Sequence, residues 1–183
     1  MSTTEFVILT SRAWALPFLS RMRKGIAGRQ ALLLLVTGAN RGAFVQSLNH
    51  LIAMGYLERN PGHGHPLRPE FRLTKQGVEV ATLAEKILAV AKSEGQDLLR
   101  RSWTLPVLAS LYQPSVFGEV KGKLPTISDR ALSQSLKSLE DQMWLTRRIE
   151  QVSRPPRSMY SSTNTGWAIS EALTDAISFA QHR

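Results

Sequence analysis

The clearest periodic pattern in the chain lies within residues 126–148, where apolar residues recur at spacings of three and four. This spacing predicts a helix whose buried face consists of Leu132, Leu136, Leu139 and Met143. Ser128 precedes the pattern, and its hydroxyl can cap a free amide of the first turn. The opposite face is polar, and on it or beside it lie Arg130, Ser133, Gln134, Lys137 and Asp141. Such side chains suit DNA phosphates and base edges, although an ordinary solvated helix face has the same pattern.

The segment after this helix has the pattern of a two-stranded hairpin. Residues 144–148 and 159–163 read as strands, and the stretch between them is rich in proline and arginine, including Arg154 and Arg157. A helix followed by a hairpin with a basic tip is typical of a winged helix-turn-helix, in which the helix enters the major groove. We therefore expect Arg154 and Arg157 to contact the phosphate backbone of double-stranded DNA.

A similar pattern occurs in the first half of the chain, at an offset of 88 or 89 residues. Trp14 is followed by Ala-Leu-Pro, as Trp103 is followed by Thr-Leu-Pro, and residues 43–48 resemble residues 131–136. An ordered series of matches indicates an internal duplication. We therefore predict two tandem winged helix-turn-helix units, residues 1–94 and 95–183, each mainly α-helical with a small β-hairpin wing.

The first half has its own candidate recognition helix, residues 40–54, with Asn40 as the cap. Its outer face includes Gln46 and Asn49 but no cation, and Arg41 only flanks it. Arg68 belongs to the first wing, a loop rich in proline, glycine and histidine. We expect both units to contact DNA and the second to carry most of the sequence preference. His63 and His65 in this wing lack a nearby acidic or cysteine partner, so no metal site is predicted.

Residues 4–22 are predicted to form one or two helices, in which Trp14 is expected to be a core residue. Further helices are predicted at residues 30–36, 78–92 and 168–180. The break at residues 93–96 separates the two predicted units.

Each half resembles an HxlR-type winged-helix regulator, a family close to the MarR group. The resemblance in the second half rests on three motifs: Trp103-x-Leu-Pro, Ile127-Ser-x-Arg130-x-Leu-Ser-x-x-Leu136-x-x-Leu139-Glu140, and Arg154-Pro-Pro-Arg157-x-x-Tyr160-x-x-Thr163-x-x-Gly166. The first half is similar over residues 66–77. Met143 stands where the family usually has glycine, as Gly55 does in the first half. The family's terminal helices pair two subunits, which implies either a homodimer or an internal pseudo-dimer of the two halves.

The composition agrees with a partner that is a nucleic acid. The chain of 183 residues has a formal net charge of +9, which favours an anionic partner. It has no cysteine, which excludes the thiol redox sensing of some family members and fits a reducing compartment. No apolar run is long enough to cross a membrane and no leader pattern is present, so we expect a cytoplasmic protein.

The sequence contains no pattern that points to catalysis or to a cofactor. It lacks a glycine-rich phosphate loop after a strand, an HExxH motif and a nucleophilic cysteine. We therefore expect a DNA-binding transcription regulator rather than an enzyme. Two alternatives remain open: a winged-helix module for protein contacts in a segregation or transcription complex, and a replication initiator of tandem winged-helix design.

Overall fold

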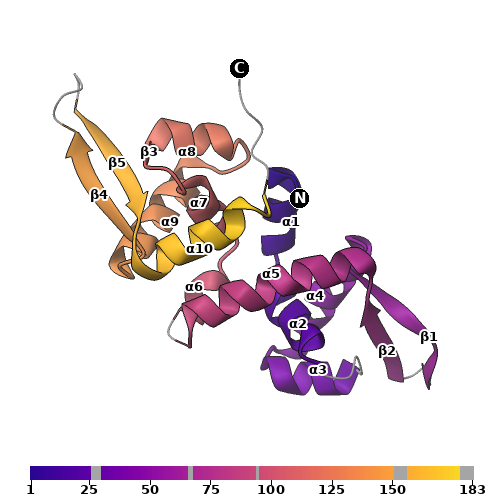
Figure 1. Ribbon diagram of the computed structural model, residues 1–183. Helices are drawn as coiled ribbons and strands as arrows, with labels where there is room; N and C mark the ends of the chain where they lie inside the picture. Colours follow the sequence, from indigo (N-terminus) through magenta and orange to yellow (C-terminus); the bar gives the residue numbers. More distant parts are fainter. Residues whose placement is uncertain (26–29, 66–67, 94, 151–155, 178–183) are drawn as a thin grey trace. The chain divides into compact units, whose positions relative to one another are not determined.

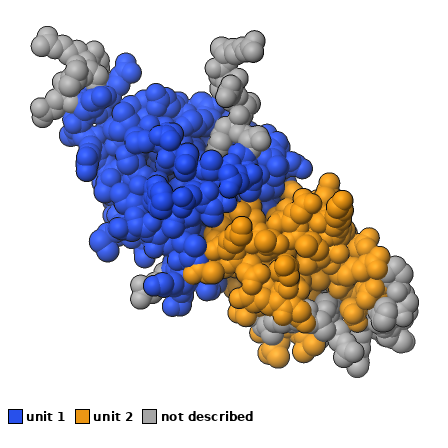
Figure 2. All heavy atoms as spheres, in the orientation of Figure 1, with its two compact units in different colours: residues 1–11, 90–183 blue, residues 12–89 orange. Residues whose placement is uncertain are grey.

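The computed structural model describes residues 1–25, 30–65, 68–93, 95–150 and 156–177 (Figure 1). The chain divides into two compact units, coloured separately in Figure 2. Unit 1 contains residues 1–11 and 90–183, and unit 2 contains residues 12–89. The division differs from the expected domains, residues 1–94 and 95–183, chiefly in the first eleven residues, which belong to unit 1.

Unit 1 is helical with one small sheet. Its helices are α1 (Thr3–Thr10), α6 (Gln96–Leu99), α7 (Thr104–Ser110), α8 (Phe117–Lys123), α9 (Asp129–Asp141) and α10 (Asn164–Thr174). The sheet is antiparallel with strand order β3-β5-β4, formed by β3 (Ser115–Val116), β5 (Arg157–Ser162) and β4 (Leu145–Glu150). Every residue of α7 is buried, and α1, α8, α9 and α10 pack against it. This helix is therefore the centre of the unit 1 core.

A buried serine fixes the last helix of unit 1 to this centre. Ser170 in α10 is fully buried, and its hydroxyl lies 2.8 Å from the carbonyl oxygen of Leu108 in α7. Burying a hydroxyl costs free energy unless it is hydrogen-bonded, so this bond favours one packing position of α10 against α7. The wing is joined to the same core, because Ser162 Oγ donates to the carbonyl of Leu111 over 3.0 Å.

Unit 2 has a similar order of elements. It contains α2 (Ala15–Arg23), α3 (Gln30–Thr37), α4 (Arg41–Ala53) and α5 (Lys75–Ala91), whose last turn passes the unit boundary. A two-stranded antiparallel sheet joins β1 (Leu57–His65) to β2 (Arg68–Leu73). In the core, the rings of Phe18 in α2 and Phe44 in α4 lie 4.6 Å apart between centroids. Trp14, expected in the core, is half-buried at the start of α2.

Both predicted helix caps are confirmed. Ser128 Oγ accepts a hydrogen bond of 3.2 Å from the backbone amide of Ala131, at the start of α9. Asn40 Oδ1 accepts one of 2.8 Å from the amide of Ala43, at the start of α4. Each cap satisfies an amide that the first helical turn leaves without a partner.

The predicted buried face of α9 is wrong at its last residue. Leu132, Leu136 and Leu139 are buried, but the side chain of Met143 is 71% exposed. Met143 has a φ of 59°, so the chain has already left the helix there, and its side chain no longer follows the helical period.

The last helix also differs from its predicted range, residues 168–180. α10 begins at Asn164, directly after the wing, and ends at Thr174. Ile177 is still buried although it lies beyond the helix, so its apolar character reflects packing rather than helical periodicity. Residues 178–180 of the prediction lie outside the described residues.

Candidate nucleic-acid interface

A turn held by lysines joins α8 to α9 in unit 1. Lys121 Nζ donates to the carbonyl oxygen of Ile127 and lies 2.8 Å from Asp129 Oδ1. Lys123 Nζ donates to the carbonyl of Ser110 over 2.9 Å and to Ser115 Oγ over 3.1 Å. Burial lowers the pKa of Lys123, and the nearby Glu119 partly opposes this. Lys121 therefore joins α8 to the start of α9, and Lys123 joins α8 to α7 and β3, so the ammonium groups of both lysines already have partners within unit 1.

The outer face of α9 presents the predicted polar residues. Arg130, Ser133, Gln134 and Lys137 are all exposed, while the leucines of the opposite face are buried. Within the described part of the chain, none of these four side chains forms a hydrogen bond or an ion pair. They are consequently available to a ligand that approaches this face, and they offer two positive charges, an amide and a hydroxyl.

The wing of unit 1 follows directly. β4 and β5 pair in register from Leu145 opposite Ser162 to Glu150 opposite Arg157. Arg157 was predicted in the tip between the strands, but β5 already begins at this residue, which is exposed and lies opposite the acidic Glu150 of β4. Arg154 lies outside the described residues.

Two further cations of β4 extend this basic surface. Arg147 and Arg148 are exposed, and Arg147 Nε donates to Ser158 Oγ over 3.0 Å. Consecutive strand residues point to opposite faces, so one of these arginines lies on each face of the wing. The predicted site did not include them, although their position in a strand predicted directly after the candidate recognition helix could have indicated them.

A compact joint connects α9, the wing and α10. The amide of Trp144 donates to the carbonyl of Leu139 over 2.9 Å, which ends α9 with Met143 in the left-handed region. The amide of Thr163 donates to the carbonyl of Trp144, also over 2.9 Å. A Cβ atom at Gly166 would lie 2.0 Å from that same carbonyl oxygen. Only glycine therefore allows α10 to start so close to the end of α9.

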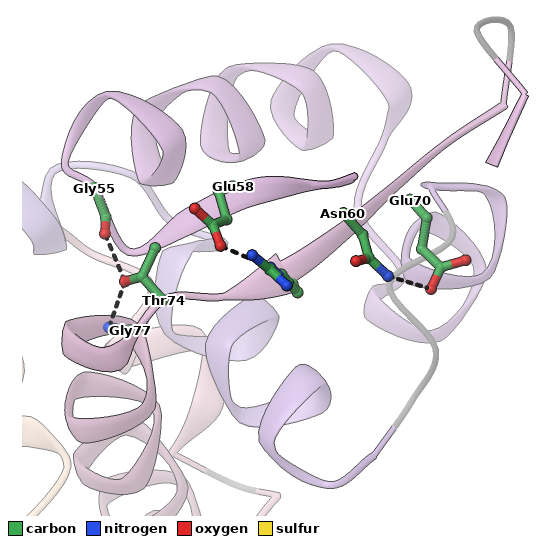
Figure 3. Close-up of polar contacts among 7 residues, drawn as sticks. Gly55, Glu58, Asn60, Glu70, Thr74 and Gly77 are labelled. Carbon is green, nitrogen blue, oxygen red and sulfur yellow. Dashed lines mark hydrogen bonds and ion pairs between the residues drawn. The ribbon is translucent and has the colours of Figure 1, made fainter. Parts of the chain in front are cut away.

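Unit 2 contains the same joint at the matching positions. The amide of Tyr56 donates to the carbonyl of Leu51 over 3.0 Å, and the amide of Thr74 donates to the carbonyl of Tyr56 over 3.1 Å. Gly55 has a φ of 73°, and a Cβ at Gly77 would lie 1.9 Å from the Tyr56 carbonyl oxygen. Figure 3 shows how Thr74 Oγ1 connects the two glycines, donating to the Gly55 carbonyl over 2.6 Å and accepting from the Gly77 amide over 3.0 Å.

The polar residues predicted on α4 are exposed, but the described part of its wing is less basic than that of unit 1. Arg41, Gln46 and Asn49 are all exposed on α4. On the adjoining strands, Arg72 Nε lies 2.6 Å from Glu58 Oε1 (Figure 3).

A second polar pair of this wing also includes a carboxylate, because Asn60 Nδ2 donates to Glu70 Oε1 over 3.3 Å. The backbone of Arg68 begins β2, but its side chain and those of His63 and His65 lie outside the description. Among the residues that are described, no group of three or more His, Cys, Asp or Glu could hold a metal ion.

A helix-turn-helix whose second helix is exposed on its polar side and followed by a β-hairpin is consistent with a winged helix-turn-helix protein. A family described as HxlR-like helix-turn-helix, which consists of DNA-binding regulators, matches residues 98–182. The chain therefore contains one HxlR-like helix-turn-helix domain. No curated protein matches the chain. In the described residues, we find no helix with the length and apolar character needed to cross a membrane.

Proposed function

We propose that this protein is a transcription regulator that binds double-stranded DNA, with α9 in the major groove and the β4–β5 wing along the backbone. The observation that carries the proposal is the outer face of α9, where Arg130, Gln134 and Lys137 are exposed without intramolecular partners among the described residues. Arginine and glutamine are side chains that recognise guanine and adenine edges in pairs of hydrogen bonds, and lysine and arginine bind phosphates. The net charge of +9 supports an anionic partner.

We further infer that the two halves are tandem winged-helix units that act as an internal pseudo-dimer. The joint around Trp144 and Gly166 recurs around Tyr56 and Gly77, with the same donors, acceptors and close approach of glycine to a carbonyl. A shared ancestral unit explains such detailed recurrence better than independent origin does. One chain would then cover two half-sites, separated in helix-turn-helix dimers by about 34 Å.

The two units would contribute unequally to DNA binding. The outer face of α4 provides Gln46 and Asn49 but no cation apart from the flanking Arg41. In its wing, the strand residues Glu58 and Glu70 accompany the cations Arg59, Arg68 and Arg72, whereas strands β4 and β5 of unit 1 have Arg147, Arg148 and Arg157 with Glu150 as the acidic residue. Phosphate contacts should therefore be stronger for unit 1, and α9 should carry most of the sequence preference.

Selection of bound duplexes from a random DNA pool, at one stated salt concentration, tests this function. We expect an enriched sequence with two half-sites, bound by a protein that sediments as a monomer of 20.4 kDa. Gln134→Ala should relax the selected sequence more than Gln46→Ala does, because Arg130 and Lys137 lie on the same face as Gln134, whereas the outer face of α4 has no cation. The two variants are comparable, since both remove an exposed amide from equivalent helices. An enriched site with a single half-site would contradict the pseudo-dimer, and a larger effect of Gln46→Ala would reverse the ranking of the units.

A role in protein contacts is the second candidate. Met143 and Trp167 in unit 1 expose large apolar side chains, with 71% and 48% of their surface accessible. Exposed apolar surface can mark a protein-binding site. Absence of DNA binding by the wild-type protein even at low salt would favour this candidate over the regulator.

A further inference from the structure

A hollow of about 260 Å³ in unit 1 lies between α9 and the segment at the start of α7. Its walls include Arg101 and Trp103 from the segment at the start of α7, and Ala131, Gln134, Ser135 and Ser138 from α9. Gln134 is also one of the exposed residues of the outer face. The hollow therefore borders the surface that would face DNA.

Arg101 is held in a defined position in this hollow. Its Nη1 donates to Ser138 Oγ over 2.9 Å, although the arginine itself is exposed. The backbone beneath it is fixed as well, because the buried Thr10 donates from Oγ1 to the carbonyl of Ser102 over 3.0 Å. The amide of Thr104 donates to the carbonyl of Arg101 over 3.2 Å. A guanidinium that is already oriented loses less conformational entropy when it binds a ligand.

The chemistry of the lining suits an anion with several oxygen atoms. Among the described residues that line it, Arg101 is the charged one, and the other polar groups are the hydroxyls of serine and threonine and the amide of Gln134. Guanidinium, hydroxyl and amide groups are the usual donors to DNA phosphate oxygens, and a guanidinium can bind two oxygens of one phosphate.

The first half of the chain has the same residue types at the corresponding positions. Arg12, Trp14, Gln46 and Ser47 match Arg101, Trp103, Gln134 and Ser135 at offsets of 88 or 89. Arg12 and Gln46 are exposed, as their counterparts are, while His50 stands at the position of Ser138. The recurrence of an arginine at this place is not required by packing, since the side chain is exposed in both halves.

We propose that Arg101, held by Ser138, binds a backbone phosphate of DNA at the edge of the groove that α9 enters. The inference rests on the proposed function and adds a contact from outside the helix-turn-helix and the wing. It predicts a contribution to affinity that does not depend on sequence, because phosphates carry no base information.

The test is a salt titration of DNA affinity for the wild type, Arg101→Ala, Ser138→Ala and Arg100→Ala, on a selected duplex and on a random one. Arg101→Ala should weaken binding to both duplexes alike, by roughly tenfold for the loss of one charge-assisted contact. It should also reduce the slope of log affinity against log salt by roughly 0.9, the value for one phosphate. Ser138→Ala should weaken binding less, since it removes only the group that orients Arg101.

Arg100→Ala is the matched control, because it removes the same charge from the neighbouring residue, whose guanidinium pairs with Asp97. Equal affinities and slopes for Arg101→Ala and Arg100→Ala would overturn the inference while leaving the proposed function intact. A wild type that binds no duplex would refute the proposed function and this contact together. If Arg101→Ala lowers the melting temperature, Arg101→Gln, which keeps a polar side chain of similar reach, replaces it in the same titration.

Discussion

A single methyl group at Gly166 should disrupt the joint that connects α9, the wing and α10. The Cβ of Gly166→Ala would lie 2.0 Å from the Trp144 carbonyl oxygen and 2.8 Å from its carbonyl carbon. Because both atoms belong to the backbone, rotation of a side chain cannot relieve the overlap. The start of α10 must move by about 1 Å or more, which strains the bond of 2.9 Å from the Thr163 amide to the same carbonyl.

The expected cost combines two effects. Overpacking of a well-packed site costs about 1–3 kcal/mol, and a weakened buried hydrogen bond adds about 1–3 kcal/mol. The gain in helix propensity from glycine to alanine returns only about 1 kcal/mol. We therefore expect Gly166→Ala to lower the free energy of unfolding by roughly 3 kcal/mol, or the melting temperature by more than about 10 °C for a unit of this size.

Urea and thermal unfolding followed by circular dichroism would measure the effect. Gly118→Ala is the control, since it lies in α8 with no atom within 4 Å of the added Cβ, and it should be neutral or slightly stabilising. Gly77→Ala should resemble Gly166→Ala, because its Cβ would meet the Tyr56 carbonyl oxygen at 1.9 Å. Unfolding of Gly166→Ala at the same midpoint as Gly118→Ala would refute the close approach on which the joint depends.

Three further predictions concern individual side chains. Met143→Gly should raise the free energy of unfolding by about 1 kcal/mol, because glycine adopts a φ of 59° without strain and the lost methionine is mostly exposed; a loss of stability in urea unfolding would contradict this. Wild type should gain stability relative to Lys123→Met as the pH rises from neutral toward 10.5, since the lowered pKa of Lys123 lets the folded state release a proton that the unfolded state still binds. A stability difference that stays constant with pH would show that this lysine does not titrate differently in the folded state. Arg157→Ala should weaken binding to all DNA sequences and reduce the salt slope by up to about 1, with a smaller effect if Glu150, its partner in the strand register, already neutralises it; an unchanged slope would place Arg157 away from DNA.

Local patterns predicted much of the candidate interface. The period of Leu132, Leu136 and Leu139, together with the Ser128 cap, predicted α9 and its outward residues, because these features depend on spacing along one helix. The hairpin was predicted for a similar reason, since strand residues and the proline-rich turn are neighbours in sequence. The prediction wrongly put Met143 on the buried face, because the apolar spacing continues to this residue. The helix in fact ends at its C-cap, Gln142, and Met143 adopts the left-handed backbone conformation.

Features that depend on distant contacts could not be predicted in the same way. The two-residue strand β3 exists through its pairing with β5, some forty residues later. Lys121 and Lys123 look like surface cations in the sequence, but the folded chain directs both to backbone carbonyls. Arg101 is far from α9 in the sequence and reaches it through its bond to Ser138, so its place beside the interface required the tertiary structure.

The most direct test of the central proposal is the affinity of wild type and Lys137→Glu for a selected duplex, measured from roughly 50 to 200 mM salt. Lys137 is exposed on the outer face of α9 and has no intramolecular partner among the described residues, so the charge reversal should leave folding intact. We predict that wild type binds the selected duplex more tightly than a random one, with affinity falling steeply as salt increases. Lys137→Glu should bind both duplexes far more weakly while unfolding at the same temperature as wild type. Equal binding by the two proteins, or no binding by wild type at the lowest salt, would contradict a DNA-binding role for this face of α9.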